Sequence, residues 1–254
     1  MTGDGVLDIG ERSGVAIVRL CHGKVNAMDT ELLAAIASAM RDIDLGVPIV
    51  LTGTDPTFSA GADLHRIIDG GPSYVEDFLS ALSEAVLAVF DRPAPVVAAV
   101  NGHAIAGGCV LAAACDLRMM SGGRIGLSEL SVGVPFPAAA LEIMRHRVGP
   151  SLGNLVLTAA LLDPAQALAV GLVDRSVRPG ELLEGAIAQA RRMGGISAEV
   201  FAFTKRALHA PVHERLATSA EDDRTVARIW FSARTRETIS AYLESLRRPT
   251  AAAP

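Results

Sequence analysis

Hydrophobic residues in the first two thirds of the chain fall into short runs that alternate with longer amphipathic segments. Residues 15–20 (VAIVRL) alternate and are rich in β-branched side chains, which is typical of a strand. The uncharged runs 48–53 and 96–100 predict two further strands, buried in the core. Shorter strands are predicted over 117–120, 124–130 and 172–177.

Helical spacing predominates between these strands. Residues 26–44 carry apolar side chains three and four positions apart, with Asp29 or Thr30 as the N-cap. Helices are also predicted over 74–90, over the alanine-rich run from Gly107, over 137–149 and, with breaks, from about 179 onwards. Alternating strands and helices followed by helices alone predict an α/β core over 1–195 and a helical C-terminal region over 196–254.

Composition narrows the function classes. Half of the 254 residues are hydrophobic, enough for one large core, and a net charge of −5 gives no electrostatic reason to bind nucleic acid. The three cysteines lack a Cys-x-x-Cys spacing, and the first residues are acidic where a signal peptide would be basic. We expect a cytoplasmic protein without disulfides or a metal site.

The uncharged stretch 93–115 is long enough to cross a membrane. It is, however, interrupted by two prolines, three glycines, an asparagine and a histidine. Because these residues would interrupt a membrane-spanning helix, the stretch is predicted to form a strand, a turn and a buried helix.

Two glycine turns each follow a buried strand, SAGADL (59–64) and AIAGGC (104–109). Without a side chain in the way, a ligand can approach the backbone of either turn closely. A helix that begins near Gly107 would also present free N–H groups and the positive end of its dipole. Two such turns can form an oxyanion hole, although glycine also serves simply to join or pack elements.

Glu129 lies between apolar neighbours in GLSELSVGVPFP (126–137). A carboxylate in an apolar wall loses hydration, so its pKa rises towards the range useful for proton transfer. The alternative is a glutamate at a strand edge that faces water, which is commoner for this residue type.

Five segments carry a resemblance to a known family: KVNAMDTELL, VLTGTDPTFSAGADL, VVAAVNGHAIAGGCVLAAACDLRM, IGLSELSVGV and ALAVGLVD. In this order and spacing they resemble the enoyl-CoA hydratase/isomerase (crotonase) superfamily, and TISAYLESLRRP resembles its closing helix. The resemblance implies the ClpP-like crotonase fold, a superhelix of repeated β-β-α units. It also implies an acyl-CoA thioester substrate without a separate cofactor, and a homotrimer or dimer of trimers completed by the C-terminal helices.

By the same resemblance, the amides of Ala62 and Gly107 hold the thioester oxygen and Glu129 carries out the proton transfer. Fixed amides would favour the enolate over the ground state. Further substrate-binding positions implied by the resemblance are Val25, Ala27, Ala60, Gly61, Asp63, Leu64, Gly108, Val110 and Pro135.

The chain departs from the hydratase pattern at Val110. Hydratases of this superfamily hold their water between two glutamates, one matching Glu129 and the other matching Val110, and valine can neither orient water nor carry a proton. The segment PFPAAALEIM (135–144) also lacks the hydratase glycines. Both departures resemble Δ3,Δ2-enoyl-CoA isomerases, in which one glutamate moves the proton. A hydratase, another crotonase-type reaction or a non-catalytic acyl-CoA binding protein remain alternatives.

Other candidates are weaker. Pro211 between His209 and His213 argues against a zinc-binding helix, and we expect structural roles for His103 and Asp116. Glu142 could replace the missing glutamate if its helix faced the pocket.

Overall fold

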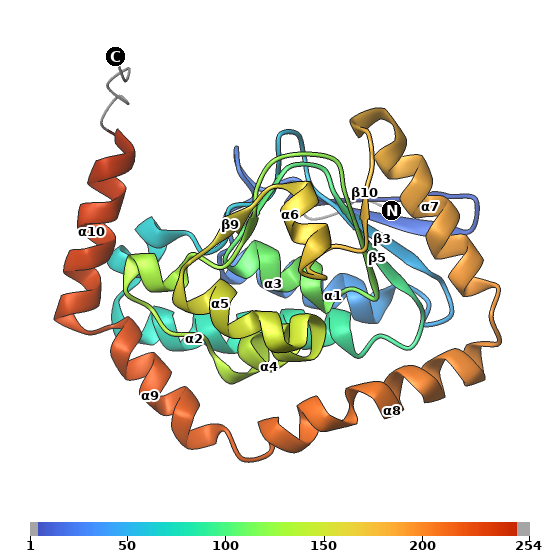
Figure 1. Ribbon diagram of the computed structural model, residues 1–254. Coiled ribbons are helices and arrows are strands. Elements are labelled where there is room, and N and C mark those ends of the chain that lie inside the picture. Colours follow the sequence, from blue (N-terminus) through green and yellow to red (C-terminus); the bar gives the residue numbers. More distant parts are fainter. Residues whose placement is uncertain (1–4, 248–254) are drawn as a thin grey trace.

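The computed structural model, which describes residues 5–247, contains two sheets with helices packed against them (Figure 1). The larger sheet is made of β1 (Leu7–Arg12), β2 (Val15–Leu20), β3 (Ile49–Thr52), β5 (Val96–Val100), β7 (Leu117–Met120) and β10 (Arg175–Ser176), in the order β1-β2-β3-β5-β7-β10. The smaller sheet is made of β4 (Thr57–Ser59), β6 (His103–Ile105), β8 (Ile125–Gly126) and β9 (Leu161–Leu162). Pairing is parallel except between β1 and β2 and between β8 and β9.

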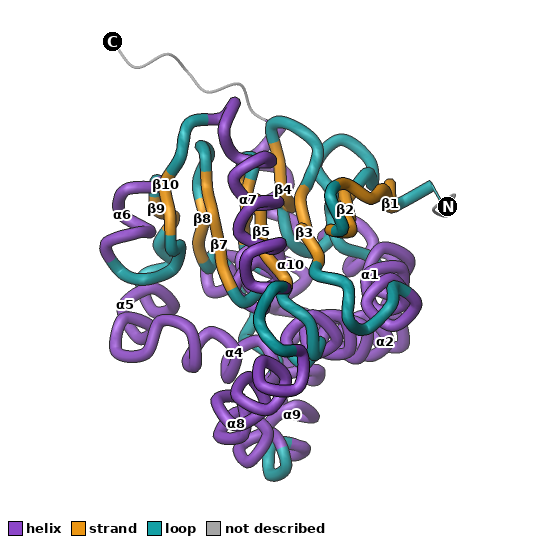
Figure 2. The backbone as a smooth tube through the Cα atoms, turned by 90° about the vertical axis from the view of Figure 1, so that its right-hand side faces the viewer, coloured by secondary structure: helices purple, strands orange, loops and turns teal. Residues whose placement is uncertain are grey.

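The helices follow these strands in a regular order. They are α1 (Thr30–Asp42), α2 (Leu64–Phe90), α3 (Gly107–Ala114), α4 (Ala138–Val148), α5 (Leu152–Leu157), α6 (Pro164–Ala169), α7 (Pro179–Gly194), α8 (Ala198–Leu216), α9 (Ala220–Trp230) and α10 (Ala233–Arg247), with short 3-10 helices at η1 (Glu129–Val132) and η2 (Gly149–Ser151). The units β3-β4-α2, β5-β6-α3 and β7-β8-α4 each place one strand in each sheet before a helix. This repetition is the predicted β-β-α superhelix, and Figure 2 shows the strands lying side by side.

Helix α3 lies at the centre of the main core, where all eight of its residues are buried and it packs between α2 and α4. Helix α7 covers the opposite face of the larger sheet with a second, smaller cluster of apolar residues. The C-terminal helices α8 and α9 run along the base of the molecule, and α10 returns to pack on α2 and η1 (Figure 1).

Most predicted elements are confirmed, and Asp29 is the N-cap of α1, its Oδ1 accepting from the Leu32 N–H at 2.8 Å. The strand predicted over 124–130 is wrong beyond Gly126. There the chain turns into η1, which ends at Gly133 in the left-handed region (φ 79°). The Val134 N–H then donates to the Glu129 carbonyl at 3.1 Å, which closes the turn.

Three further features differ from the sequence pattern. Strand β1 and the short strands β4, β6 and β9 were not predicted. Helix α2 runs from Leu64 to Phe90 but is interrupted at Gly71 (φ 71°, ψ −168°), directly before Pro72. Helix α8 continues through Pro211, so that proline does not end it.

The uncharged stretch 93–115 divides into β5, β6 and α3, as predicted. No helix within residues 5–247 is both long and apolar enough to span a membrane. The predicted C-terminal region, 196–254, is described up to Arg247, and the remainder of TISAYLESLRRP lies outside the described residues.

Candidate active site

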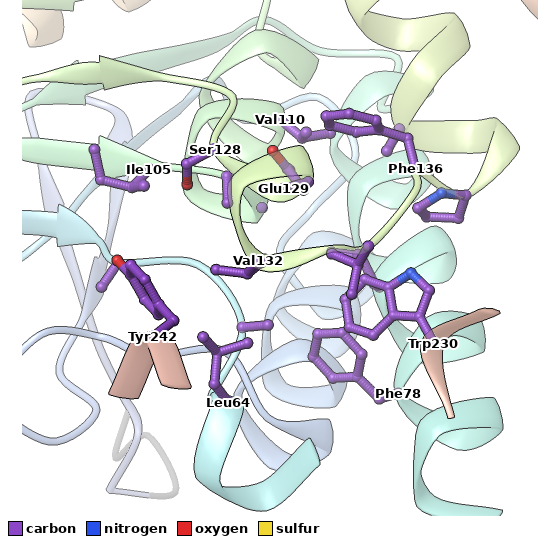
Figure 3. Close-up of a pocket in the computed structure, with 18 residues that line it drawn as sticks. Leu64, Phe78, Ile105, Val110, Ser128, Glu129, Val132, Phe136, Trp230 and Tyr242 are labelled. Carbon is purple, nitrogen blue, oxygen red and sulfur yellow. The ribbon is translucent and has the colours of Figure 1, made fainter. Parts of the chain in front are cut away.

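A pocket of about 660 Å³, its open mouth included, lies between α2, α3, η1 and the C-terminal helices (Figure 3). Its wall is apolar except for the side chains of Ser128, Glu129 and Tyr242 and the indole N–H of Trp230. Both glycine turns contribute to it, through Ala62 and Gly107. The pocket therefore brings together the three residues for which the sequence predicted catalytic roles.

Glu129 is the first residue of η1 and points into this apolar pocket (Figure 3). The residue is 7% exposed, and its Oε2 has no hydrogen-bond partner among the described residues. Burial raises the pKa of Glu129 to about 8. The alternative of a water-facing strand-edge glutamate is wrong, because the side chain is buried and its residue lies in a 3-10 turn.

In the turn at 59–64 the Ala62 amide lies between residues whose own amides are hydrogen-bonded. The N–H of Ala60 donates to the Val25 carbonyl at 3.0 Å, and that of Asp63 donates to the Met28 carbonyl at 2.8 Å. The Gly61 N–H donates to Ser59 Oγ at 3.2 Å. Between them, the Ala62 N–H has no acceptor within the described part of the chain.

The second turn packs directly against the first. Gly61 has φ 83°, and a Cβ on it would lie 2.8 Å from the Ile105 oxygen and 3.4 Å from the Gly107 nitrogen. The two backbones approach this closely because neither carries a bulky side chain at the contact. Ala62 and Gly107 therefore line the same pocket from adjacent segments.

Helix α3 begins at Gly107 without a side-chain cap. Its N-cap, Ala106, has φ 52° and ψ −122°, a conformation that costs an alanine on the order of 1–3 kcal/mol. The Gly107 N–H has no acceptor among residues 5–247 and lies at the positive end of the helix. An oxygen that gains negative charge in the pocket would be stabilised at this position.

Of the other predicted substrate-binding residues, Ala60, Leu64 and Val110 line the pocket. The remaining six do not line it; these are Val25, Ala27, Gly61, Asp63, Gly108 and Pro135. Several of the six support the site structurally. Asp63 is the N-cap of α2, and a Cβ on Gly108 would lie 2.4 Å from the Ser59 carbonyl oxygen. Contact of any of these residues with a ligand stays a prediction.

The sequence did not single out the aromatic part of the pocket, which comprises Phe78, Phe136, Trp230 and Tyr242. Phe78 lies on the buried face of an amphipathic helix, so its position in the sequence pattern indicates only a core residue. Trp230 and Tyr242 come from α9 and α10, about 100 residues after Glu129. The one available signal was that Trp230 is the chain's single tryptophan.

Glu142 lies outside the pocket. It is 9% exposed and binds Arg145 at 3.1 Å and Arg215 at 3.3 Å. These ion pairs direct its carboxylate towards α8, so it does not replace the missing glutamate.

The other polar candidates have structural partners. Asp116 accepts from the Val96 N–H at 2.8 Å and pairs with Lys205 at 2.9 Å, as its predicted structural role requires. His103 accepts from the Arg124 N–H at 3.3 Å. His209 stacks on a phenylalanine and His213 binds Asp91 at 2.8 Å. Within the described residues, no group of three or more His, Cys, Asp or Glu side chains is arranged to hold a metal ion.

The chain is similar to several known proteins. The family model described as enoyl-CoA hydratase/isomerase matches residues 10–250. A Thermus thermophilus protein assigned as an enoyl-CoA hydratase is 38% identical over 212 residues, covering 79% of this chain and 82% of that protein. Human mitochondrial enoyl-CoA delta isomerase 1 is 27% identical over 219 residues, covering 83% of this chain and 72% of that protein. The crystal structure of human mitochondrial delta3-delta2-enoyl-CoA isomerase is similar with a TM-score of 0.89 at 25% identity, covering 97% of this chain and 100% of that one.

Proposed function

Because the chain belongs to the enoyl-CoA hydratase/isomerase family, we propose that it moves the double bond of a 3-enoyl-CoA to position 2. Glu129 removes a proton from C2, and the electron pair shifts through the thioester carbonyl to give a dienolate. The amides of Ala62 and Gly107 hold the dienolate oxygen. Glu129 then returns the proton to C4, which leaves the double bond between C2 and C3.

The observation that carries this proposal is that Glu129 is the only carboxylate among the pocket-lining residues of the described chain. One base is sufficient because the same proton is removed and returned. A pKa of about 8 makes the carboxylate a stronger base than a solvated glutamate. Val110, 1% exposed, occupies the position that the resemblance assigns to the second hydratase glutamate, and its apolar side chain keeps water from that part of the wall.

Hydration of a 2-enoyl-CoA is the second candidate. It is favoured by the assigned name of the Thermus relative and by the Ser128 hydroxyl, which lines the pocket next to Glu129. In that reaction Ser128 would hold the water that Glu129 activates.

A direct comparison of two substrates tests the proposal. The protein is given trans-3-hexenoyl-CoA and crotonyl-CoA in parallel, and the conjugated and hydrated products are quantified. We expect conjugation of the first without hydration of the second. Hydration of crotonyl-CoA without conjugation of the hexenoyl thioester would establish the second candidate, and binding without either product would indicate a non-catalytic acyl-CoA binder.

The remaining implications of the family resemblance are part of the proposal. The reaction needs no cofactor besides the coenzyme A of the substrate, and the protein works in the cytoplasm as a homotrimer or dimer of trimers. Sedimentation of the purified protein measures the assembly state.

A further inference from the structure

An aromatic wall closes one end of the pocket. Phe78 of α2 and Trp230 at the end of α9 are 1% and 3% exposed, and their ring centroids are 5.8 Å apart. Figure 3 shows the two rings side by side beneath Phe136, on the opposite side of the pocket from Ile105 and Tyr242. Glu129 lies between these two sides, so an acyl chain that reaches it from the Ile105 side continues towards the wall.

This wall is fixed at two points. The Trp230 indole N–H donates to the Pro135 carbonyl at 2.8 Å, in the loop that follows η1. About two turns earlier on α9, Asp223 accepts from the Ala138 N–H at 2.9 Å, which ties α9 to the start of α4. Because both contacts hold α9 against the segment 135–138, Trp230 cannot move aside without breaking a hydrogen bond.

A separate groove lies directly behind the wall. Leu79 and Phe231, the chain neighbours of Phe78 and Trp230, line this groove, and Pro137 lines both the groove and the pocket. Pocket and groove are thus lined by adjacent residues of the same two helices and share Pro137. We expect that shortening Phe78 would join the two spaces.

We propose that Phe78 and Trp230 limit the length of the acyl chain, so that the substrate is a short-chain enoyl-CoA. This inference rests on the proposed function for the identity of the ligand, because it assigns the acyl chain to this pocket. Each methylene buried in an apolar site strengthens binding by about fourfold. A pocket that is open at this end would therefore bind long acyl chains much more tightly than short ones. In a closed pocket, carbons beyond the wall are not buried and add nothing to the affinity.

The test uses saturated acyl-CoAs, which bind but cannot react. Calorimetry measures the affinity of hexanoyl-CoA and dodecanoyl-CoA for the wild-type protein. We expect the longer ligand to bind no more tightly than the shorter one. Dodecanoyl-CoA binding more than tenfold tighter than hexanoyl-CoA would overturn the proposal.

Two variants then open the wall. In Phe78→Ala, the affinity for dodecanoyl-CoA relative to hexanoyl-CoA should rise at least tenfold, since the longer chain reaches the groove. Phe78→Leu keeps more of the packing and should raise the same ratio of affinities at least threefold. It replaces the alanine variant in the test if that variant does not fold. A folded variant with the wild-type ratio would contradict the proposed role of Phe78.

Phe231→Ala is the matched control, because Phe231 lines the groove and not the pocket. It should leave the ratio of affinities unchanged. The binding measurements do not depend on turnover, so they distinguish the two proposals. If six- and twelve-carbon substrates were isomerised at equal rates, the proposed length limit would be wrong and the proposed reaction would stand. If the binding ratios were as expected but no substrate were isomerised, the proposed reaction would be wrong and the length limit would stand.

Discussion

At its C-terminal end helix α3 is held by cationic side chains, whereas no side chain caps its N-terminal end. The Cys115 carbonyl, which follows the helix, accepts from Arg118 at 3.2 Å and from Arg147 at 2.8 Å. Next to it, Asp116 pairs with Lys205. At the other end Gly107, whose N–H has no acceptor in the described chain, lines an apolar pocket with one buried carboxylate.

Polar groups at the C-terminal end of α3 therefore stabilise the fold, whereas those at its N-terminal end remain available to a ligand. Buried polar groups in folded proteins are almost always paired. At the C-terminal end of α3 the Cys115 carbonyl and the Asp116 carboxylate are paired, and only the Nε of Arg118 lacks a partner in the described chain. At the N-terminal end the Gly107 N–H has no acceptor in the described chain, and the Ala62 N–H and Glu129 Oε2, which belong to residues that line the same pocket, have no hydrogen-bond partner there either. Changes at the open end should therefore affect chemistry, and changes at the satisfied end should affect stability.

The largest effect is expected for Glu129→Gln. The amide side chain keeps the shape of the carboxylate but cannot accept the C2 proton, so isomerisation of trans-3-hexenoyl-CoA should fall by at least about a thousandfold. Affinity for hexanoyl-CoA should change little. Glu142→Gln is the matched control at a buried, paired carboxylate, and we expect it to retain most of the turnover. Undiminished turnover in Glu129→Gln would remove this residue from the mechanism.

Removal of a single amide donor should have the next largest effect. Replacing the Gly107 peptide N–H by an ester oxygen deletes one proposed contact to the dienolate, and kcat/KM should fall about 100- to 1000-fold. Circular dichroism and thermal unfolding check the fold. The same replacement at Leu33, whose N–H donates to the Asp29 carbonyl at 3.1 Å, is the control for a lost structural hydrogen bond. Equal rates in both esters would show that the Gly107 amide does not touch the developing charge.

At the C-terminal end of α3, Lys205→Met should lower the free energy of unfolding by about 3 kcal/mol, because it leaves the Asp116 carboxylate, only 11% exposed, without its cation. Turnover at 25 °C should change less than threefold, since neither residue lines the pocket. Denaturant unfolding and steady-state kinetics measure the two quantities. A catalytic loss as large as that of the Gly107 ester, in a protein of normal stability, would contradict the division between the two ends.

The smallest single step is a change of one pH unit. Since the ionised form of Glu129 is the base and its pKa is about 8, kcat/KM should rise about tenfold per pH unit below pH 8 and level off above it. The same shift acts on stability. Between pH 4.5 and about 8 the folded state holds a proton that the unfolded state has lost, so the free energy of unfolding falls as pH rises, by at most about 1.4 kcal/mol per unit. Denaturant titrations of wild type and Glu129→Gln should diverge over this range, and parallel curves would show that the carboxylate is not buried in solution.

Strands β2, β3 and β5 of the larger sheet were predictable because their apolar pattern can be read from the sequence. Strand β1 was missed although it is as long as β2, because most of its residues are exposed and it lacks that pattern. Strands β4, β6 and β9, of two or three residues, carry no such pattern, and the smaller sheet exists only through pairing of distant segments. Family resemblance located the turn residues Ala62 and Gly107 together with Glu129. It could not place Phe78 against Trp230, since that contact depends on the path of α8 and α9 around the core.

The interruption of α2 at Gly71 divides the wall of the pocket between two rigid pieces. Leu64, on the first piece, borders the pocket seven residues before the break, and Phe78, on the second, closes it seven residues after the break. A helix without its regular hydrogen bonds at one point bends there more readily than elsewhere. Under the proposed function, the segment that borders the reacting part of the thioester and the segment that limits its tail are therefore joined by a break in the helix and not by a continuous one.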